Sequence, residues 1–62
     1  MGTRLVETYE IGAGVEVRLR SSRWFYARVI GHEHPGVWVQ DDLGRQWYVT
    51  NARHIRRKRN ES

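Results

Sequence analysis

Hydrophobic and polar side chains alternate along most of this chain, which predicts a series of short β-strands. Val15, Val17 and Leu19 are separated by charged residues, the period of a strand with one buried face. The run at 24–31 is the richest in aromatic and β-branched residues, and we expect it to be the central strand. Its inward-facing residues are expected to be Phe25, Ala27 and Val29, and its outward-facing residues Trp24, Tyr26, Arg28 and Ile30.

Two more alternating segments follow the central run. In a strand over 37–40, the two valines are expected inward and Trp38 outward. In a strand over 45–50, Trp47 and Val49 share one face, and Gln46 and Tyr48 share the other.

The connections between these segments have the composition of loops and turns. Gly and Pro bracket residues 31–36, which predicts a loop, and the Asp-Asp-Leu-Gly sequence at 41–44 is typical of a tight turn. Residues 51–54 suit a single helical turn that opens at Asn51, and residues 55–56 are just long enough for a closing strand.

Five short strands with tight connections predict one small, strongly bent antiparallel barrel. A chain of 62 residues forms a single domain with a small core. We expect residues 1–11 to be a loosely ordered lead-in, from which Leu5, Tyr9 and Ile11 are placed to cap the barrel. The barrel itself is expected over 12–57, and a disordered basic tail over 58–62.

The amino-acid composition limits the kinds of chemical site that this chain can form. The chain has no cysteine, which excludes disulfides, thiolate metal sites and a cysteine nucleophile. It shows no apolar run long enough to span a bilayer, so we expect a soluble, cytoplasmic protein. The net charge is +4, and nearly all of the excess lies in residues 51–62, whereas residues 14–50 are almost neutral.

Two of these segments resemble motifs of SH3-like barrels, and above all of the Tudor-like branch. Residues 24–29, Trp-Phe-Tyr-Ala-Arg-Val, resemble the Tudor run W-Y-x-A-x-V, and residues 39–44 resemble the turn after the third Tudor strand. The resemblance covers roughly residues 12–56 and implies a five-stranded barrel with one helical turn before the last strand.

Tudor domains that read methylated side chains use an aromatic cage, which attracts a cation to ring faces. The positions of this chain that match the cage are Ser21, Phe25, Gln40, Leu43 and Arg45. Because only Phe25 among them is aromatic, the resemblance implies the fold and not methyl recognition.

A second resemblance is to type II dihydrofolate reductases, which are SH3-like barrels of similar size. Gln46-Trp47-Tyr48 is similar to the Gln-Ile-Tyr run of their catalytic pore. Leu19 stands where that family has a lysine, and Trp47 stands where it has isoleucine. A reductase-like assembly of several protomers is therefore the most remote hypothesis.

The outward-facing residues predict a binding surface. We expect an arginine-and-aromatic patch, since cross-strand neighbours lie within about 5 Å of each other. Its expected members are Arg18, Arg20, Tyr26, Arg28, Trp38, Gln46 and Tyr48. Rings stack on bases and guanidinium groups attract phosphates, so the patch favours nucleic acid. Protein interfaces use the same residues, so a protein partner or a homo-oligomer is the alternative. A third interpretation involves no ligand, because arginine stems can cover the aromatic side chains of a small barrel and keep it soluble.

The basic run near the C-terminus adds to this hypothesis. Arg56, Arg57, Lys58 and Arg59 are expected on a flexible end, where each phosphate contact adds salt-dependent affinity without reading sequence.

Catalytic and metal sites are weakly indicated. His32 and His34 flank Glu33, and His54 is a possible third ligand, but this spacing is more typical of a polar loop. The carboxylates of Asp41 and Asp42 are neighbours in a turn rather than an acid–base pair. We therefore expect a non-enzymatic module without a cofactor or a metal.

Overall fold

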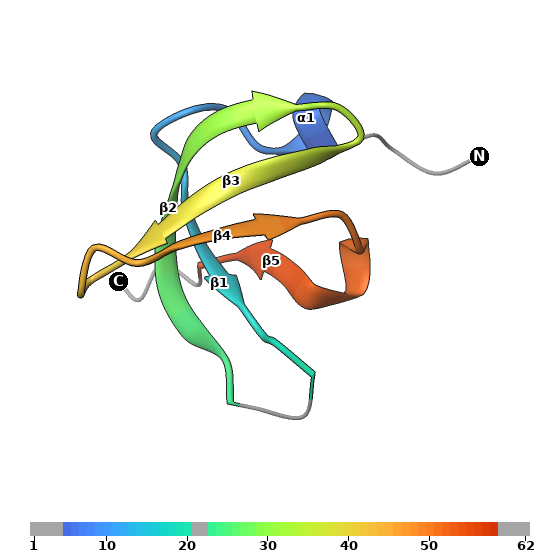
Figure 1. Ribbon diagram of the computed structural model, residues 1–62. Coiled ribbons are helices and arrows are strands. Elements are labelled where there is room, and N and C mark those ends of the chain that lie inside the picture. Colours follow the sequence, from blue (N-terminus) through green and yellow to red (C-terminus); the bar gives the residue numbers. More distant parts are fainter. Residues whose placement is uncertain (1–4, 21–22, 59–62) are drawn as a thin grey trace.

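The computed structural model describes residues 5–20 and 23–58. These residues form one short helix, five β-strands and one 3-10 turn (Figure 1). The elements in chain order are α1 (Leu5–Thr8), β1 (Gly14–Val17), β2 (Phe25–Glu33), β3 (Gly36–Asp41), β4 (Gln46–Val49), η1 (Ala52–His54) and β5 (Ile55–Arg57).

The five strands form one antiparallel sheet with the order β4-β3-β2-β1-β5. The long strand β2 lies at the centre and curves through the whole molecule (Figure 1). The sheet is not closed, because β4 and β5 are its two edges. The all-β class, the five antiparallel strands and the 3-10 turn before the last strand confirm the predicted architecture at this level.

One face of the sheet forms the hydrophobic core. Its buried residues come from all five strands and are Val15, Val17, Ala27, Val29, Val37, Val39, Val49 and Ile55. Phe25 and Trp47 pack against this core and are half-buried. The predicted inward and outward faces of β2, β3 and β4 are therefore confirmed, because period-2 alternation sends successive side chains to opposite faces.

The predicted loop at 31–36 is wrong for most of its length. Strand β2 continues through Glu33, β3 begins at Gly36, and only residues 34–35 connect them. The register shifts from Val29 opposite Val39 to Gly31 opposite Trp38, so Ile30 is the extra residue of a β-bulge. The polar composition of this segment is compatible with a strand because its side chains are exposed and its backbone pairs with β3.

The segment before β1 differs from the loosely ordered lead-in that we expected. Leu5 begins the short helix α1, and Leu5 and Tyr9 are 5% and 8% exposed as members of the core. The Tyr9 hydroxyl donates to the Ile55 carbonyl oxygen at 3.4 Å. The main-chain carbonyl oxygen of Tyr9 lies 2.7 Å from Nε2 of His32. Ile11, the third residue expected to cap the core, is 60% exposed.

Two local predictions are confirmed by side-chain hydrogen bonds. The carboxamide oxygen of Asn51 accepts from the Arg53 N–H at 2.8 Å and caps η1. In the β3–β4 turn, Asp41 Oδ1 accepts from the N–H groups of Leu43 and Arg45 at 2.9 Å each. Gly44 has a φ of 83°, a conformation that glycine adopts without steric cost.

Candidate functional site

The outer face of the sheet carries most of the residues predicted to bind a partner. Strand register places Arg28 opposite Gln40 and Gln40 opposite Gln46, so these three form one row across β2, β3 and β4. Trp38 and Tyr48 are paired in the next row. The structure therefore brings part of the expected patch onto one surface, in two groups with different neighbours.

The first group, here called the basic–aromatic cluster, consists of Trp24, Tyr26, Arg28, Arg56 and Lys58. Arg56 lies over the Trp24 ring, with its Cζ atom 3.9 Å from the ring centroid. Lys58 lies over the Tyr26 ring, with Nζ 4.6 Å from the centroid. Arg28 Nη2 donates to the Tyr26 hydroxyl at 3.5 Å. Cations thus cover ring faces throughout this cluster.

Strand β1 holds the cluster together. Glu16 lies opposite both Tyr26 and Arg56 in the ladder and accepts from Arg56 Nε at 2.7 Å. Gly14 leaves room for the Tyr26 ring, since a Cβ atom there would lie 3.2 Å from Tyr26 Cε1. The side-chain hydrogen bond with Tyr26 raises the pKa of the Arg28 guanidinium above its ordinary value.

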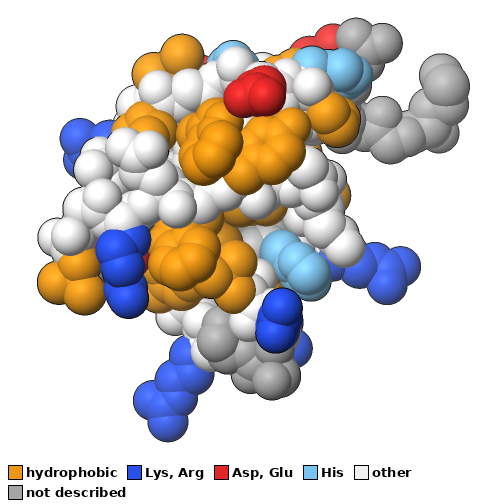
Figure 2. Space-filling model, viewed as in Figure 1, with side chains coloured by type: hydrophobic (Ala, Val, Ile, Leu, Met, Phe, Trp, Pro, Cys, Tyr) orange, Lys and Arg blue, Asp and Glu red, His pale blue; other side chains and the backbone are white. Residues whose placement is uncertain are grey.

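The second group, here called the ring pair, consists of Trp38 and Tyr48. Their ring centroids are 5.2 Å apart and the planes are tilted by 39°. The indole Nε1–H of Trp38 donates to Glu33 Oε1 at 3.0 Å. In Figure 2, hydrophobic side chains gather over β3 and β4 with an acidic side chain against them, in agreement with these contacts. The charged group that contacts the ring pair is therefore a carboxylate, whereas the charged groups on the ring faces of the basic–aromatic cluster are cations.

Two arginines of the expected patch lie elsewhere. Strand β1 ends at Val17, and the N–H of Arg18 bonds to the His54 carbonyl oxygen at 2.9 Å rather than to β2. Arg20 has a φ of 53°, which takes the chain out of an extended conformation. The expectation that both arginines extend the first strand is therefore wrong. Both arginines follow Val17, the last residue of β1, whereas Arg28 pairs with Gly14, the first residue of β1. Arg18 and Arg20 therefore lie at the other end of β1 from Arg28.

The basic run at 56–59 is only partly a tail. Arg56 and Arg57 belong to β5, and the N–H of Lys58 donates to the Gly14 carbonyl oxygen at 3.3 Å. Arg57 Nη2 donates to the Thr8 carbonyl oxygen at 2.7 Å, and its guanidinium lies 5.5 Å from the Tyr9 ring centroid. The expected closing strand at 55–56 is confirmed, and the placement of Arg56 and Arg57 on a flexible end is wrong. Arg59 lies outside the described residues.

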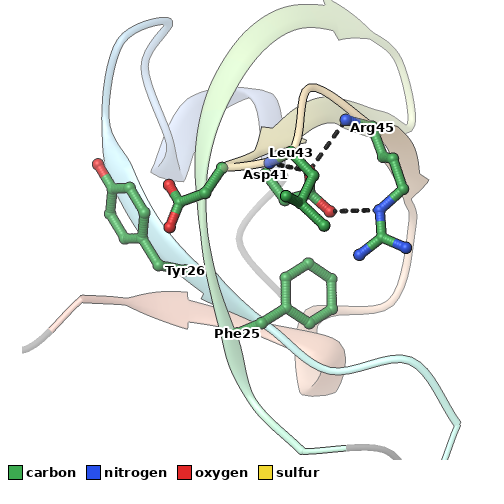
Figure 3. Close-up of a pocket in the computed structure, with 6 residues that line it drawn as sticks. Phe25, Tyr26, Asp41, Leu43 and Arg45 are labelled. Carbon is green, nitrogen blue, oxygen red and sulfur yellow. Dashed lines mark hydrogen bonds and ion pairs between the residues drawn. The ribbon is translucent and has the colours of Figure 1, made fainter.

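A small hollow opens beside the β3–β4 turn and has a volume of about 170 Å³. Its lining residues are Phe25, Tyr26, Asp41, Asp42, Leu43 and Arg45 (Figure 3). Phe25, Leu43 and Arg45 are three of the five residues that the sequence resemblance placed at cage positions. Trp47 contacts Phe25 edge-on at 6.2 Å, and Arg45 lies 5.7 Å from the Trp47 ring. Trp47 is not one of the lining residues, but it packs against two of them, Phe25 and Arg45, and alternation along the strand did not predict these contacts.

Asp41 serves the turn rather than acid–base chemistry. Its side chain is 6% exposed, and Oδ2 accepts from Arg45 Nε at 3.0 Å and from Trp47 Nε1 at 3.4 Å. Desolvation raises the pKa of Asp41, but the hydrogen bonds from Arg45, Trp47 and Leu43 together outweigh it and lower the pKa below its ordinary value. An ionised carboxylate with this many donors is fixed in place, which agrees with the predicted role in the turn.

The histidines considered as metal ligands are not gathered into a site. His32 contacts the Tyr9 carbonyl oxygen, and no group of three His, Cys, Asp or Glu residues suited to a metal occurs within 5–20 and 23–58. Within these same ranges, no helix has the length and apolar character required to cross a membrane.

No family model, curated protein or solved structure matches the chain. Functional conclusions therefore depend on the geometry of the outer face.

Proposed function

We propose that this chain is an SH3-like, Tudor-like barrel that serves as a small non-enzymatic module for binding nucleic acid. The basic–aromatic cluster is the proposed contact surface, and Arg59 with the rest of the C-terminal basic run adds attraction for phosphates. The resemblance of residues 24–29 and 39–44 supports the barrel type, together with the strand number and the 3-10 turn.

The observation that carries the proposal is the gathering of Arg28, Arg56 and Lys58 on one surface with two aromatic rings. Glu16 neutralises Arg56, so the cluster retains the positive charge of Arg28 and Lys58. Such a surface neutralises phosphates, releases their counterions and makes affinity strongly dependent on salt. It also has the composition that single-stranded nucleic acid binders use.

The test is a titration of a labelled oligonucleotide at about 50 mM and about 200 mM salt. We expect measurable binding at low salt, and we expect Arg28→Ala and Lys58→Ala each to reduce the affinity and the slope of log affinity against log salt. Arg53→Ala is the matched control, because it removes the same charge from η1, at the opposite end of β5 from Lys58. Absence of binding at low salt, or equal losses for Arg28→Ala and Arg53→Ala, would contradict the proposal.

Binding to a protein or to a second copy remains the alternative. It predicts affinity with little dependence on salt, because apolar contacts are not screened by ions. Light scattering on the full chain measures the mass directly, and a concentration-dependent dimer or tetramer would favour this alternative.

A further inference from the structure

The polar atoms of the ring pair are already satisfied within the chain. The Trp38 N–H is bonded to Glu33 Oε1. The Tyr48 hydroxyl donates to the Glu33 carbonyl oxygen at 2.6 Å and accepts from the Gly36 N–H at 3.2 Å. A ligand that approaches the ring pair therefore meets ring surface rather than hydrogen-bonding groups. Tyr48 is 39% exposed and Trp38 is half-buried, so part of this surface is accessible.

The ring pair is also held in position before any ligand arrives. Three hydrogen bonds fix the two side chains, and the Tyr48 ring lies against Gly36, where a Cβ atom would be 3.0 Å from Tyr48 Cε1. A rigid ring loses little conformational entropy on binding, which favours affinity per contact.

The position of the ring pair relative to the cationic groups indicates its occupant. Arg28 lies opposite Gln40, and Trp38 lies two residues before Gln40 on the same face, a separation of about 7 Å along the strand. Gly31, opposite Trp38, has no side chain, and the side chains on this face between Arg28 and Trp38 are those of Gln40 and of Ile30, which is 36% exposed. A ligand can thus contact the basic–aromatic cluster and the ring pair at once.

The charges of the two groups have opposite signs. Arg28 and Lys58 attract phosphate, whereas the carboxylate of Glu33 at the edge of the ring pair repels it. A polyanion with flat, uncharged appendages matches this arrangement, because its backbone can follow the cations while its appendages reach the rings. Unpaired nucleobases have these properties, and bases stacked inside a duplex do not expose their faces.

We propose that Trp38 and Tyr48 form a stacking platform for unpaired bases, which makes single strands the preferred ligand. The inference rests on the proposed nucleic-acid function and adds the form of nucleic acid that is bound. Within the cluster, Arg56 and Lys58 already cover faces of the Trp24 and Tyr26 rings, so the ring pair is the surface that stacks.

The experiment compares a labelled single strand with the blunt duplex of the same length, using the full chain. We expect Trp38→Ala to weaken single-strand binding by about tenfold, in line with the loss of one stacked base. Duplex affinity and the salt slope are expected to stay unchanged, because the phosphate contacts remain. Trp24→Ala is the comparison variant: its ring supports Arg56 within the proposed contact surface, so its loss should weaken single strand and duplex by the same factor and leave the preference unchanged. Leu43→Ala is the control, because Leu43 lies in the β3–β4 turn outside both groups and is 77% exposed, and it should change neither affinity.

A second variant keeps the test decisive if Trp38→Ala folds poorly. Trp38→Phe retains a ring and is expected to keep the single-strand preference within about threefold, while the quenching of tryptophan emission by the single strand falls.

Equal losses for single strand and duplex in Trp38→Ala, or loss of the preference in Trp24→Ala alone, would overturn the platform. The nucleic-acid function would still stand if the wild-type chain binds with a steep salt slope. If the wild-type chain binds neither ligand at low salt, both proposals fail.

Discussion

The basic–aromatic cluster and the ring pair lie on the same outer face and each contain one tryptophan and one tyrosine, but the groups that contact these rings differ. In the cluster, Arg56 and Lys58 sit on ring faces. In the ring pair, the polar edges are bonded to Glu33 and Gly36, and the two rings lie beside each other with their centroids 5.2 Å apart. The part of an aromatic side chain that a ligand can reach on a sheet therefore depends on which groups the neighbouring residues place against it.

The two groups also differ in how they are attached to the backbone. The Tyr48 hydroxyl bonds to two main-chain groups of the β2–β3 connection, at Glu33 and Gly36. The Tyr26 hydroxyl meets only a long contact of 3.5 Å from the Arg28 side chain. The ring pair is thus part of the framework, whereas the cluster consists of long side chains that can rearrange around a ligand.

The largest difference in stability is expected between alanine substitutions of the two glycines that lie against the tyrosine rings, Gly36 at Tyr48 and Gly14 at Tyr26. A Cβ atom at Gly36 would overlap the Val49 carbonyl oxygen and press on Thr50 and Tyr48. Backbone on the neighbouring strand cannot move aside without separating β3 from β4. We expect Gly36→Ala to lower the free energy of unfolding by about 3 kcal/mol, from a total of about 3–9 kcal/mol for a chain of this size.

Urea denaturation followed by tryptophan fluorescence measures this loss. Gly31→Ala is the control, because the nearest atom to a Cβ there is Trp38 Cβ at 3.9 Å, an ordinary contact. We expect it to change stability by less than about 1 kcal/mol. If Gly36→Ala were as mild as Gly31→Ala, the close packing of β3 on β4 beneath Tyr48 would be refuted.

A smaller effect is expected when the hydroxyl groups are removed. Tyr48→Phe loses the bonds to the Glu33 carbonyl oxygen and the buried Gly36 N–H, which should cost about 1–2 kcal/mol of unfolding free energy. Tyr26→Phe should cost less than about 0.5 kcal/mol, because its one long contact is solvent-exposed. Equal costs in chemical denaturation would contradict the distinction between a fixed and an adaptable group.

Acid should weaken the hairpin that carries the ring pair through Asp41. The hydrogen bonds that lower the pKa of Asp41 in the folded chain mean that the unfolded chain binds the proton more readily. This contribution to stability is therefore complete above the ordinary pKa of 3.8, and it is lost as pH falls through the lower folded value.

Chemical denaturation of wild type and Asp41→Asn from neutral pH to about pH 2 isolates this contribution. We expect the wild type to be more stable at neutral pH and the difference to shrink below about pH 4, where the Asp41 carboxylate of the unfolded chain takes up its proton before that of the folded chain. A difference that stays constant over this range would mean that the charge of Asp41 does not support the turn.

Local pattern predicted much of the fold, for physical reasons that show at individual residues. Val37, Trp38 and Val39 alternate because a pleated strand between core and solvent requires it, so their faces were predictable. Asn51 and Gly44 were predictable because a cap and a positive φ depend on the residue itself.

What could not be predicted depends on segments that are distant in the sequence. Strand β2 extends to Glu33 only because β3 folds back along it, and Leu5 is buried only because the core leaves space there. For the outer face, alternation identified Tyr26, Arg28, Trp38 and Tyr48. It did not show that Lys58 would cover Tyr26, since this contact requires β5 to pair with β1.

The smallest effect on stability is expected at Gly14, beneath Tyr26. A Cβ atom there would meet Tyr26 Cε1 at 3.2 Å, but the obstacle is the far end of a side chain that can rotate toward solvent. We therefore expect Gly14→Ala to cost less than about 1 kcal/mol in denaturation, while the displaced ring separates from Lys58 and Arg28. Oligonucleotide affinity should then fall modestly for single strand and duplex alike. A cost as large as that of Gly36→Ala would show that the cluster is as rigid as the ring pair, because the ring would then be unable to yield.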